Sequence, residues 1–253
     1  MNIDGVAAIV TGGASGLGAA TVKALTGKGA RVAILDFDRA NAERYAAETG
    51  ARAVVCDVAD AAGAEAAVAA AEAAHGPARI LVNCAGVGTP GKAVGKDGPL
   101  PLAAFAKVIG INLIGTFNLV RLAAARMQTL EPLAGGERGV IVNTASVAAY
   151  DGQIGQVAYA ASKGGIVSLT LPLAREFASF GIRVMTIAPG IFLTPLLRTL
   201  PEKAQQSLAA SVPFPNRLGD PAEFAALVVH ILENQMLNGE VIRLDAAIRM
   251  APR

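Results

Sequence analysis

The sequence of 253 residues lacks several features that mark other classes of protein. It contains no tryptophan, and aromatic residues make up only 4% of it, which argues against a stacking platform for single-stranded nucleic acid. The net charge is +2 and no basic cluster stands out, so we expect no nucleic-acid partner. The two histidines, His75 and His230, lie in helical patterns without partners in the sequence, and we therefore predict no metal site.

Cysteine is scarce as well, since Cys56 and Cys84 are the only two, each at the end of an apolar run. Buried thiols in a reducing compartment explain this pattern better than a disulfide does. The opening residues Met-Asn-Ile-Asp-Gly include neither the basic segment nor the apolar stretch of a signal peptide. We therefore expect a cytoplasmic protein.

A long uncharged apolar run is also absent, although 53% of the residues are hydrophobic and the mean hydropathy is +0.47. A membrane-spanning helix needs about 18 or more such residues in succession. The longest alanine-rich stretch, 59–74, is interrupted by Asp60, Glu65 and Glu72. The hydrophobicity is better explained by alanine content, a buried sheet and subunit interfaces, so we expect no membrane segment.

What the chain does contain is a regular alternation of β-branched runs and helical stretches. The expected strands are 6–11, 31–36, 53–56, 79–83, 140–145, 182–188 and 241–244. The expected helices are 16–27, 39–49, 61–75, 102–130, 157–180 and 221–232, the last preceded by Asp220, Pro221 and Glu223 as start signals. Seven strands with intervening helices predict an α/β protein with a doubly wound Rossmann fold and a seven-stranded parallel sheet. No repeat, linker or shift in composition divides the chain, so we predict one domain over residues 1–253.

A glycine-rich turn, Thr11-Gly-Gly-Ala-Ser-Gly-Leu-Gly18, joins the first expected strand to the first helix. Small residues let the backbone approach a pyrophosphate, and the helix N-terminus supplies free N–H groups and positive dipole. Such a turn alone can be a mere tight connection, but its place in the chain predicts a dinucleotide site. The predicted contacts in the turn are Gly12, Ser15, Gly16, Leu17 and Gly18.

An acidic residue, Asp36, ends the second expected strand, where a carboxylate can accept hydrogen bonds from both adenosine ribose hydroxyls. The same charge would repel a 2′-phosphate. A site for NADP would have a cation in the turn or just after the strand, but Ser15 and Phe37-Asp38 stand there. Asp36 therefore predicts NAD as the cofactor, the alternative being a helix-capping acid.

The ends of later strands carry further candidates for cofactor contacts. Small or polar residues there are mostly turn-formers, so each is weak evidence alone. Asp57 and Val58 follow the third strand, and Cys84, Ala85 and Gly86 follow the fourth. The group at the end of the sixth strand, which could meet the nicotinamide carboxamide, consists of Pro189, Phe192 and Thr194.

Tyr159 and Lys163 are four residues apart, so a helix would place them on one face, one turn apart. A cation beside a phenol favours the phenolate and makes it a usable base near neutral pH. The hydroxyl of Ser146, arriving from another element, could polarise a carbonyl beside them. Singly, a strand-end serine and a Tyr/Lys pair are commonplace, but together they can move a proton on or off an alcohol.

These motifs together resemble the short-chain dehydrogenase/reductase family. The resemblance rests on the glycine-rich turn, the segment 83–86, Asn112, Ser146 and the pair Tyr159 and Lys163, and it covers essentially the whole chain. It implies that Tyr159 is the acid/base, that Lys163 lowers its pKa and binds the nicotinamide ribose, and that Ser146 holds the substrate oxygen. It further implies a water relay at Asn112 and, less firmly, a place near the substrate oxygen for Gln153.

Within that family, the segments 138–149, 159–167, 183–190, 212–223 and 237–245 are most similar to the 3-hydroxyacyl-CoA dehydrogenases. This similarity implies NAD-dependent oxidation of a 3-hydroxyacyl-CoA to the 3-oxoacyl-CoA, in fatty-acid or branched-chain acyl-CoA breakdown, by a homotetramer. Ala246 stands where such relatives usually have glycine. If that position needs a positive φ, Ala246 costs stability.

The segments 88–101 and 191–214 lie where we expect the substrate to be framed. The second contains apolar residues that could cover an acyl chain, or equally form surface or subunit contacts: Leu193, Leu196, Leu197, Leu200 and Phe214. Basic residues that could meet coenzyme A phosphates, or simply be solvated, are Lys92, Lys96, Arg198 and Lys203.

Other functions are compatible with parts of this pattern. The same chemistry could act on a steroid, on another secondary alcohol, or on an acyl-carrier-protein thioester in the direction of reduction. Asp36 argues against the last, because biosynthetic reductases usually prefer NADPH. A dinucleotide-binding scaffold without turnover is a further alternative, although Ser146, Tyr159 and Lys163 are all intact.

Overall fold

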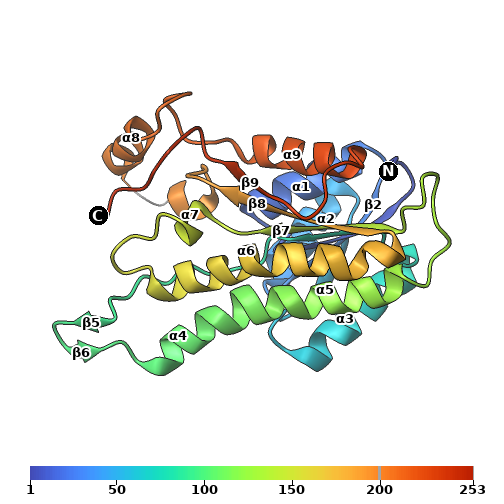
Figure 1. Ribbon diagram of the computed structural model, residues 1–253, viewed down its shortest axis with the longest axis horizontal. Coiled ribbons are helices and arrows are strands. Elements are labelled where there is room, and N and C mark those ends of the chain that lie inside the picture. Colours follow the sequence, from blue (N-terminus) through green and yellow to red (C-terminus); the bar gives the residue numbers. More distant parts are fainter. Residues whose placement is uncertain (199–200, 253) are drawn as a thin grey trace.

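The computed structural model of the chain describes residues 1–198 and 201–252, and a parallel sheet runs through its centre (Figure 1). Its seven strands lie in the order β3-β2-β1-β4-β7-β8-β9. Their bounds are β1 Ala7–Thr11, β2 Arg31–Asp36, β3 Arg52–Val55, β4 Ile80–Asn83, β7 Gly139–Thr144, β8 Ile182–Pro189 and β9 Val241–Leu244. Every pairing in this sheet is parallel. The predicted doubly wound fold is confirmed. Each strand begins and ends within one residue of its predicted position.

Helices cover both faces of the sheet, because the central strands bury side chains on each side. One core layer joins the sheet to α1 (Gly16–Gly27), α2 (Arg39–Thr49) and α9 (Pro221–Glu233). The other joins it to α3 (Ala61–His75), α5 (Gly115–Met127) and α6 (Val157–Phe177). The β-branched runs of β1, β4, β7 and β8 are buried throughout, as expected for a sheet covered on both faces.

The stretch 102–130, predicted as one helix, is divided in the structure. It consists of α4 (Leu102–Ile109), a π-helical turn η1 (Gly110–Ile114) and α5. Asn112, at the centre of η1, is fully buried and bonded to another segment. Single π-turns inside helices occur frequently at functional sites, because the extra residue per turn re-aims a side chain. The prediction of a continuous helix was wrong at this point for a reason that periodicity does not reveal.

The two segments that were expected to frame the substrate also contain regular elements. The segment 88–101 forms a hairpin of β5 (Val94–Gly95) and β6 (Gly98–Pro99), which projects from one end of the molecule (Figure 1). The segment 191–214 contains α7 (Pro195–Arg198) and α8 (Glu202–Ala210). Asp220 and Glu223 form the predicted capping box at the start of α9.

Two helical stretches are apolar and long enough to cross a membrane by length and composition, 102–127 and 157–180. Core helices of globular proteins pass the same test. Both stretches supply buried residues to the packing against the sheet, Leu119 from α5 and Leu173 from α6 among them. Their exposed side carries Ile114, Phe117 and Leu171.

Candidate active site

The predicted functional residues converge at the carboxyl ends of the parallel strands. The strand order reverses between β1 and β4, whose following connections run in opposite directions along the sheet. Ligands bind open α/β sheets at such a switch point. The start of α6, which carries Tyr159, lies at the same end of the molecule as the hairpin, α7 and α8 (Figure 1).

Backbone packing explains the glycines of the turn between β1 and α1. Gly12 has φ of +61°, and a Cβ there would lie 2.8 Å from backbone atoms of Ala85. A Cβ on Gly18 would lie 2.1 Å from the carbonyl oxygen of Gly12. Gly16 faces Thr194, whose Cγ2 would be 3.4 Å from an added Cβ. The structure therefore brings together three of the predicted cofactor segments in a cradle that larger residues would fill.

Asp36 supports the turn from the end of β2. One carboxylate oxygen accepts a hydrogen bond from the amide of Ala14, and the other accepts one from Asp38, each at 3.0 Å. The helix α2 is capped by Asp38, which accepts from the Asn41 amide, so the capping alternative for Asp36 is wrong. Asn41 in turn donates to the carbonyl of Ala14. Ser15 is exposed and stands at the start of α1 without a side-chain capping bond.

A row of buried polar groups beneath the cofactor segments was not anticipated from the sequence. The hydroxyl of Thr11 accepts hydrogen bonds from the amides of Cys84 and Ala85, each at 3.1 Å, and donates to Asn83. Asn83 donates to the side chain of Asn143 at 2.9 Å. This row fixes the segment after β4 against the glycine-rich turn. The feature of the sequence that could have predicted this row is the presence of polar residues inside otherwise apolar strands.

Asn112 joins η1 to the segment that follows Gly86. Its side-chain oxygen accepts from the amide of Val87 at 2.8 Å, and its nitrogen donates to the Val87 carbonyl at 2.9 Å. The nitrogen also donates to the hydroxyl of Ser162, which donates to the carbonyl of Tyr159. Asn112 is thereby tied to the first turns of α6.

Lys163 is buried, and its ammonium group donates a 2.7 Å hydrogen bond to the carbonyl of Thr144 at the end of β7. The nitrogen lies 5.7 Å from the centre of the Tyr159 ring. The nitrogen would lie 3.6 Å from a Cβ on Gly86, so a residue without a side chain there leaves space beside the ammonium group. Burial lowers the pKa of Lys163 from 10.5 to about 8, and the neighbouring Cys84 acts in the opposite sense.

Burial raises the pKa of Tyr159 above its usual value, and a hydrogen bond with Ser146 partly opposes that effect. Removal from water has the larger effect on the pKa of Tyr159 in the protein alone, and the lowering of that pKa by Lys163 stays a prediction. Ser146 itself is buried and accepts a hydrogen bond from the amide of Ala148 at 3.1 Å. The three side chains of the predicted catalytic group nonetheless lie together.

The remaining predicted cofactor residues lie at the same edge of the sheet. Asp57 is exposed, and its carboxylate accepts a hydrogen bond from the backbone amide of Ala59. Val58 is buried, and its carbonyl accepts a hydrogen bond from the side-chain amide of Asn118. Pro189 ends β8. Phe192 is buried, and its ring would lie 2.8 Å from a Cβ on Gly219, so its side chain belongs to the core.

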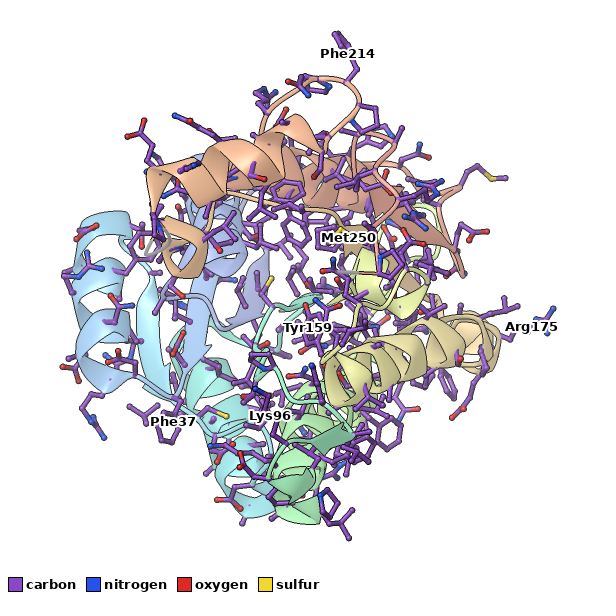
Figure 2. All side chains as sticks on the ribbon, turned by 90° about the vertical axis from the view of Figure 1, so that its left-hand side faces the viewer. Phe37, Lys96, Tyr159, Arg175, Phe214 and Met250 are labelled. Atoms are coloured by element: carbon purple, nitrogen blue, oxygen red, sulfur yellow. The ribbon has the colours of Figure 1, made fainter. Side chains whose placement is uncertain are left out.

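The predicted substrate residues are placed less uniformly. The side-chain amide of Gln153 donates to the carbonyl of Ala251. Phe214 is 84% exposed and projects outward from the molecule in Figure 2, so it covers no pocket in this structure. Leu200 lies outside the described residues. Lys92 and Lys96 are exposed on the hairpin segment, and Figure 2 shows Lys96 on the side of the molecule that faces the viewer.

A groove of about 820 Å³ lies between α8 and α9. It is lined by Leu193, Ala209, Leu218, Ala222 and other residues, with Arg217 and Glu223 among them. Ser146, Tyr159 and Lys163 are not part of this lining. The groove is therefore separate from the catalytic group.

The model of the short chain dehydrogenase family matches residues 6–205. The chain belongs to this family. It is 53% identical over 255 residues to the 3-hydroxyacyl-CoA dehydrogenase type-2 of Bos taurus, covering 99% of this chain and 98% of the relative. The protein of the same name from Drosophila melanogaster is 50% identical, with 99% and 100% covered. The crystal structure of 3-hydroxyacyl-CoA dehydrogenase type-2 from Mycobacterium avium has a TM-score of 0.91 and 44% identity, with 98% of each chain covered.

Membership of the family makes the protein an oxidoreductase that uses a nicotinamide dinucleotide. The geometry fits such a cofactor, because Gly12 and Gly16 are partly exposed and Gly86 is exposed along the switch point. The ammonium of Lys163 and the phenol of Tyr159 lie beside the same segment.

Proposed function

We propose that the protein oxidises a 3-hydroxyacyl-CoA to the 3-oxoacyl-CoA, reversibly and with NAD. The observation that carries the proposal is 53% identity along the whole chain to a protein named 3-hydroxyacyl-CoA dehydrogenase type-2. The side chains needed for alcohol oxidation are intact and lie together, as described above for Ser146, Tyr159 and Lys163.

Tyr159 exchanges the proton of the substrate hydroxyl, and Ser146 holds the oxygen beside it. Because burial raises the pKa of Tyr159, the phenol is protonated in the free protein and is ready as an acid for carbonyl reduction. Alcohol oxidation requires the phenolate, which nearby positive charge favours. Lys163 provides such a charge, and its bond to the Thr144 carbonyl holds it in place.

A bound nicotinamide would supply the acceptor for the hydride that leaves the substrate carbon. The chain's own contribution is to hold the reacting groups together and to exclude water from them. Asn112 contributes to this by fixing the Val87 backbone and the first turns of α6 at once.

NAD rather than NADP is supported by Asp36. Its carboxylate lies next to the Ala14 amide at the glycine-rich turn and is followed by Phe37 and a second acid, Asp38. A 2′-phosphate placed there would meet two negative charges.

We also propose a homotetramer in the cytoplasm. The exposed apolar residues Ile114, Phe117, Val157 and Leu171 on η1, α5 and α6 support subunit contacts along these helices. Two free cysteines suit a reducing compartment. Light scattering on the purified chain tests the oligomeric state, and a monomer would overturn it.

The function is tested by following NADH absorbance with acetoacetyl-CoA as the substrate. The same assay is run with NADPH, and in the oxidative direction with a steroid alcohol and NAD. We expect turnover of the acyl-CoA with NADH to exceed that of the other two combinations. Faster turnover with NADPH would overturn the choice of cofactor, and faster turnover of the steroid would overturn the choice of substrate.

A further inference from the structure

The end of the chain folds back onto the segment that joins Ser146 to α6. We call residues 246–252 the C-terminal segment. The carbonyl of Pro252 accepts a hydrogen bond from the amide of Ile154 at 3.0 Å. The carbonyl of Ala251 accepts the side-chain amide of Gln153 at 2.9 Å, and the Met250 backbone is hydrogen-bonded to Asp151. Three successive residues of the C-terminal segment therefore contact residues 151–154.

This contact lies at the catalytic end of the molecule. Figure 1 places the C-terminus on the same side as the start of α6 and the hairpin. Figure 2, which looks onto that side, shows Met250 and Tyr159 near the centre of the view. The hydrogen bonds to Gln153 and Ile154 place the C-terminal segment beside the loop that carries Gln153.

Arg243, on the edge strand β9, connects the C-terminal segment to the turn that contains Asp151. Its guanidinium forms a bidentate ion pair with Asp151, with the shorter nitrogen–oxygen distance at 2.6 Å. It also donates to Asp245 at 2.7 Å and to the carbonyl of Ile248 at 3.1 Å. Its carbon Cζ lies 5.2 Å from the centre of the Tyr150 ring. One side chain therefore holds both the 150–151 turn and the C-terminal segment.

The ion pair is shielded from water. The side chains of Arg243 and Asp151 are 21% and 15% exposed, and the hydrogen bond between them lowers the pKa of the carboxyl. A bidentate arginine–carboxylate pair also fixes orientation, which a lysine cannot do.

The C-terminal segment begins with two residues in an unfavourable conformation. Ala246 and Ala247 have φ of +50° and +64°, a region that residues with a Cβ rarely adopt. Asp245 accepts the amide of Ala247 at 3.1 Å and also contacts Arg249. Such strain persists only where surrounding contacts maintain it, and Arg243 supplies them through Asp245 and Ile248.

The turn held by Arg243 sets the position of Ser146. The short helix η2 (Val147–Ala149) begins directly after Ser146, and its first amides bond back to the serine. The amide of Asp151 donates to the carbonyl of Val147 at 2.8 Å. A displacement of Asp151 would therefore be transmitted through one helical turn to the Ser146 hydroxyl.

We propose that Arg243 is a positioning residue, which holds the C-terminal segment against the 150–154 turn and so keeps Ser146 and Gln153 in place for the substrate. The proposal rests on the proposed function for the identity of the substrate, but its structural part does not depend on it. Within the described part of the chain, the hydrogen bonds of the Arg243 side chain go to Asp151, Asp245 and Ile248, and none goes to the dinucleotide cradle or to Lys163. The effect should therefore fall on the alcohol or ketone side of the reaction.

The test compares Arg243→Met, Asp151→Asn and the double variant with the wild-type protein. We expect Arg243→Met to lower kcat/KM for the acyl-CoA about ten- to hundredfold, as a misplaced polar group does. The KM for the dinucleotide should stay within about twofold. The double variant should lose no more than Arg243→Met alone, because removing Arg243 already breaks its ion pair with Asp151. Arg243→Lys should recover only part of the activity.

Arg126→Met is the matched control, because Arg126 forms an ion pair with Glu72 on the surface away from the site. It should leave kcat/KM unchanged. Hydrogen–deuterium exchange gives a readout independent of the substrate: residues 146–156 should exchange faster in Arg243→Met and not in Arg126→Met. Unchanged exchange there, or equal losses in dinucleotide and substrate affinity, would overturn the positioning role. Absence of acyl-CoA turnover by the wild type would instead overturn the proposed function alone.

Discussion

The ammonium nitrogen of Lys163 lies 5.7 Å from the centre of the Tyr159 ring while bonded to the Thr144 carbonyl at 2.7 Å. A strand-end carbonyl thus fixes a cation next to a phenol. Burial disfavours the charged form of both groups, so it raises the pKa of Tyr159 and lowers that of Lys163 to about 8. Near pH 7 both groups are therefore mainly protonated in the protein alone. Additional positive charge beside Tyr159 would be needed to favour its phenolate.

Tyr159→Phe should keep dinucleotide binding and lose turnover by a factor of about 10²–10⁴, the usual contribution of a positioned acid or base. The ring and its contacts remain, and only the exchangeable proton is removed. Stopped-flow measurement of kcat and a fluorescence titration with NADH separate the two effects. Ser162, which also bonds to this turn, provides a control in Ser162→Ala, whose loss should be smaller. Near-normal turnover in Tyr159→Phe would refute the proposed acid/base role.

Lys163→Met should stabilise the fold near neutral pH while abolishing activity. The pKa of Lys163 is lowered from 10.5 to about 8, so the unfolded chain binds more protons between these values and stability rises with pH there. Below pH 8 the cost of burying the charge is fully present. The variant should therefore gain on the order of 1–3 kcal/mol at pH 7, and the gain should shrink as pH rises from 8 to 10.5.

Thermal unfolding of the two proteins at several pH values measures this difference. Lys23→Met, at an exposed position on α1, is the matched control and should show no such pH trend. A lower midpoint for Lys163→Met than for the wild type at pH 7 would contradict the account, and would mean that the bond to Thr144 outweighs the cost of burial.

Asp36→Ala should weaken NAD binding by roughly 1.5–3 kcal/mol, the range for hydrogen bonds to a charged group. The ratio of kcat/KM for NADP to that for NAD should rise at least about tenfold, because the repulsion of a 2′-phosphate is reduced. Asp38→Ala separates this effect from helix capping, since Asp38 caps α2. That variant should lose stability by about 1 kcal/mol with the preference for NAD largely kept. An unchanged ratio in Asp36→Ala would be incompatible with its assigned role.

Ala246→Gly should stabilise the protein. At the φ of +50° of Ala246, a Cβ is unfavourable by roughly 1–2 kcal/mol, and glycine removes this cost. Glycine also loses more conformational entropy on folding, which offsets part of the gain. The net gain should be about 0.5–1 kcal/mol, a rise of a few degrees in the unfolding midpoint. Ala62→Gly in the exposed first turn of α3 should act in the opposite direction. A loss of stability in Ala246→Gly would show that its conformation carries no strain.

Local patterns in the sequence accounted for much of the fold. The buried β-branched runs predict the seven strands, because a sheet covered on both faces needs apolar residues at every position. The glycines at 12, 16 and 18 and the acid Asp36 predict the cofactor site, since each answers a local backbone or charge requirement. The resemblance raised the question of a positive φ at Ala246, where relatives usually have glycine, and the structure gives Ala246 a φ of +50°.

Interactions between distant segments decided the rest. The π-turn at Asn112 depends on Val87, and the buried row from Thr11 to Asn143 spans three strands. The reach of the C-terminal segment to residues 151–154 depends on Arg243, which no local pattern distinguishes from a surface arginine. The sequence by itself determined which elements form and which residues can do chemistry, because propensity and periodicity act over a few residues. Only the tertiary structure decided which of them meet, and how strongly removal from water changes their pKa.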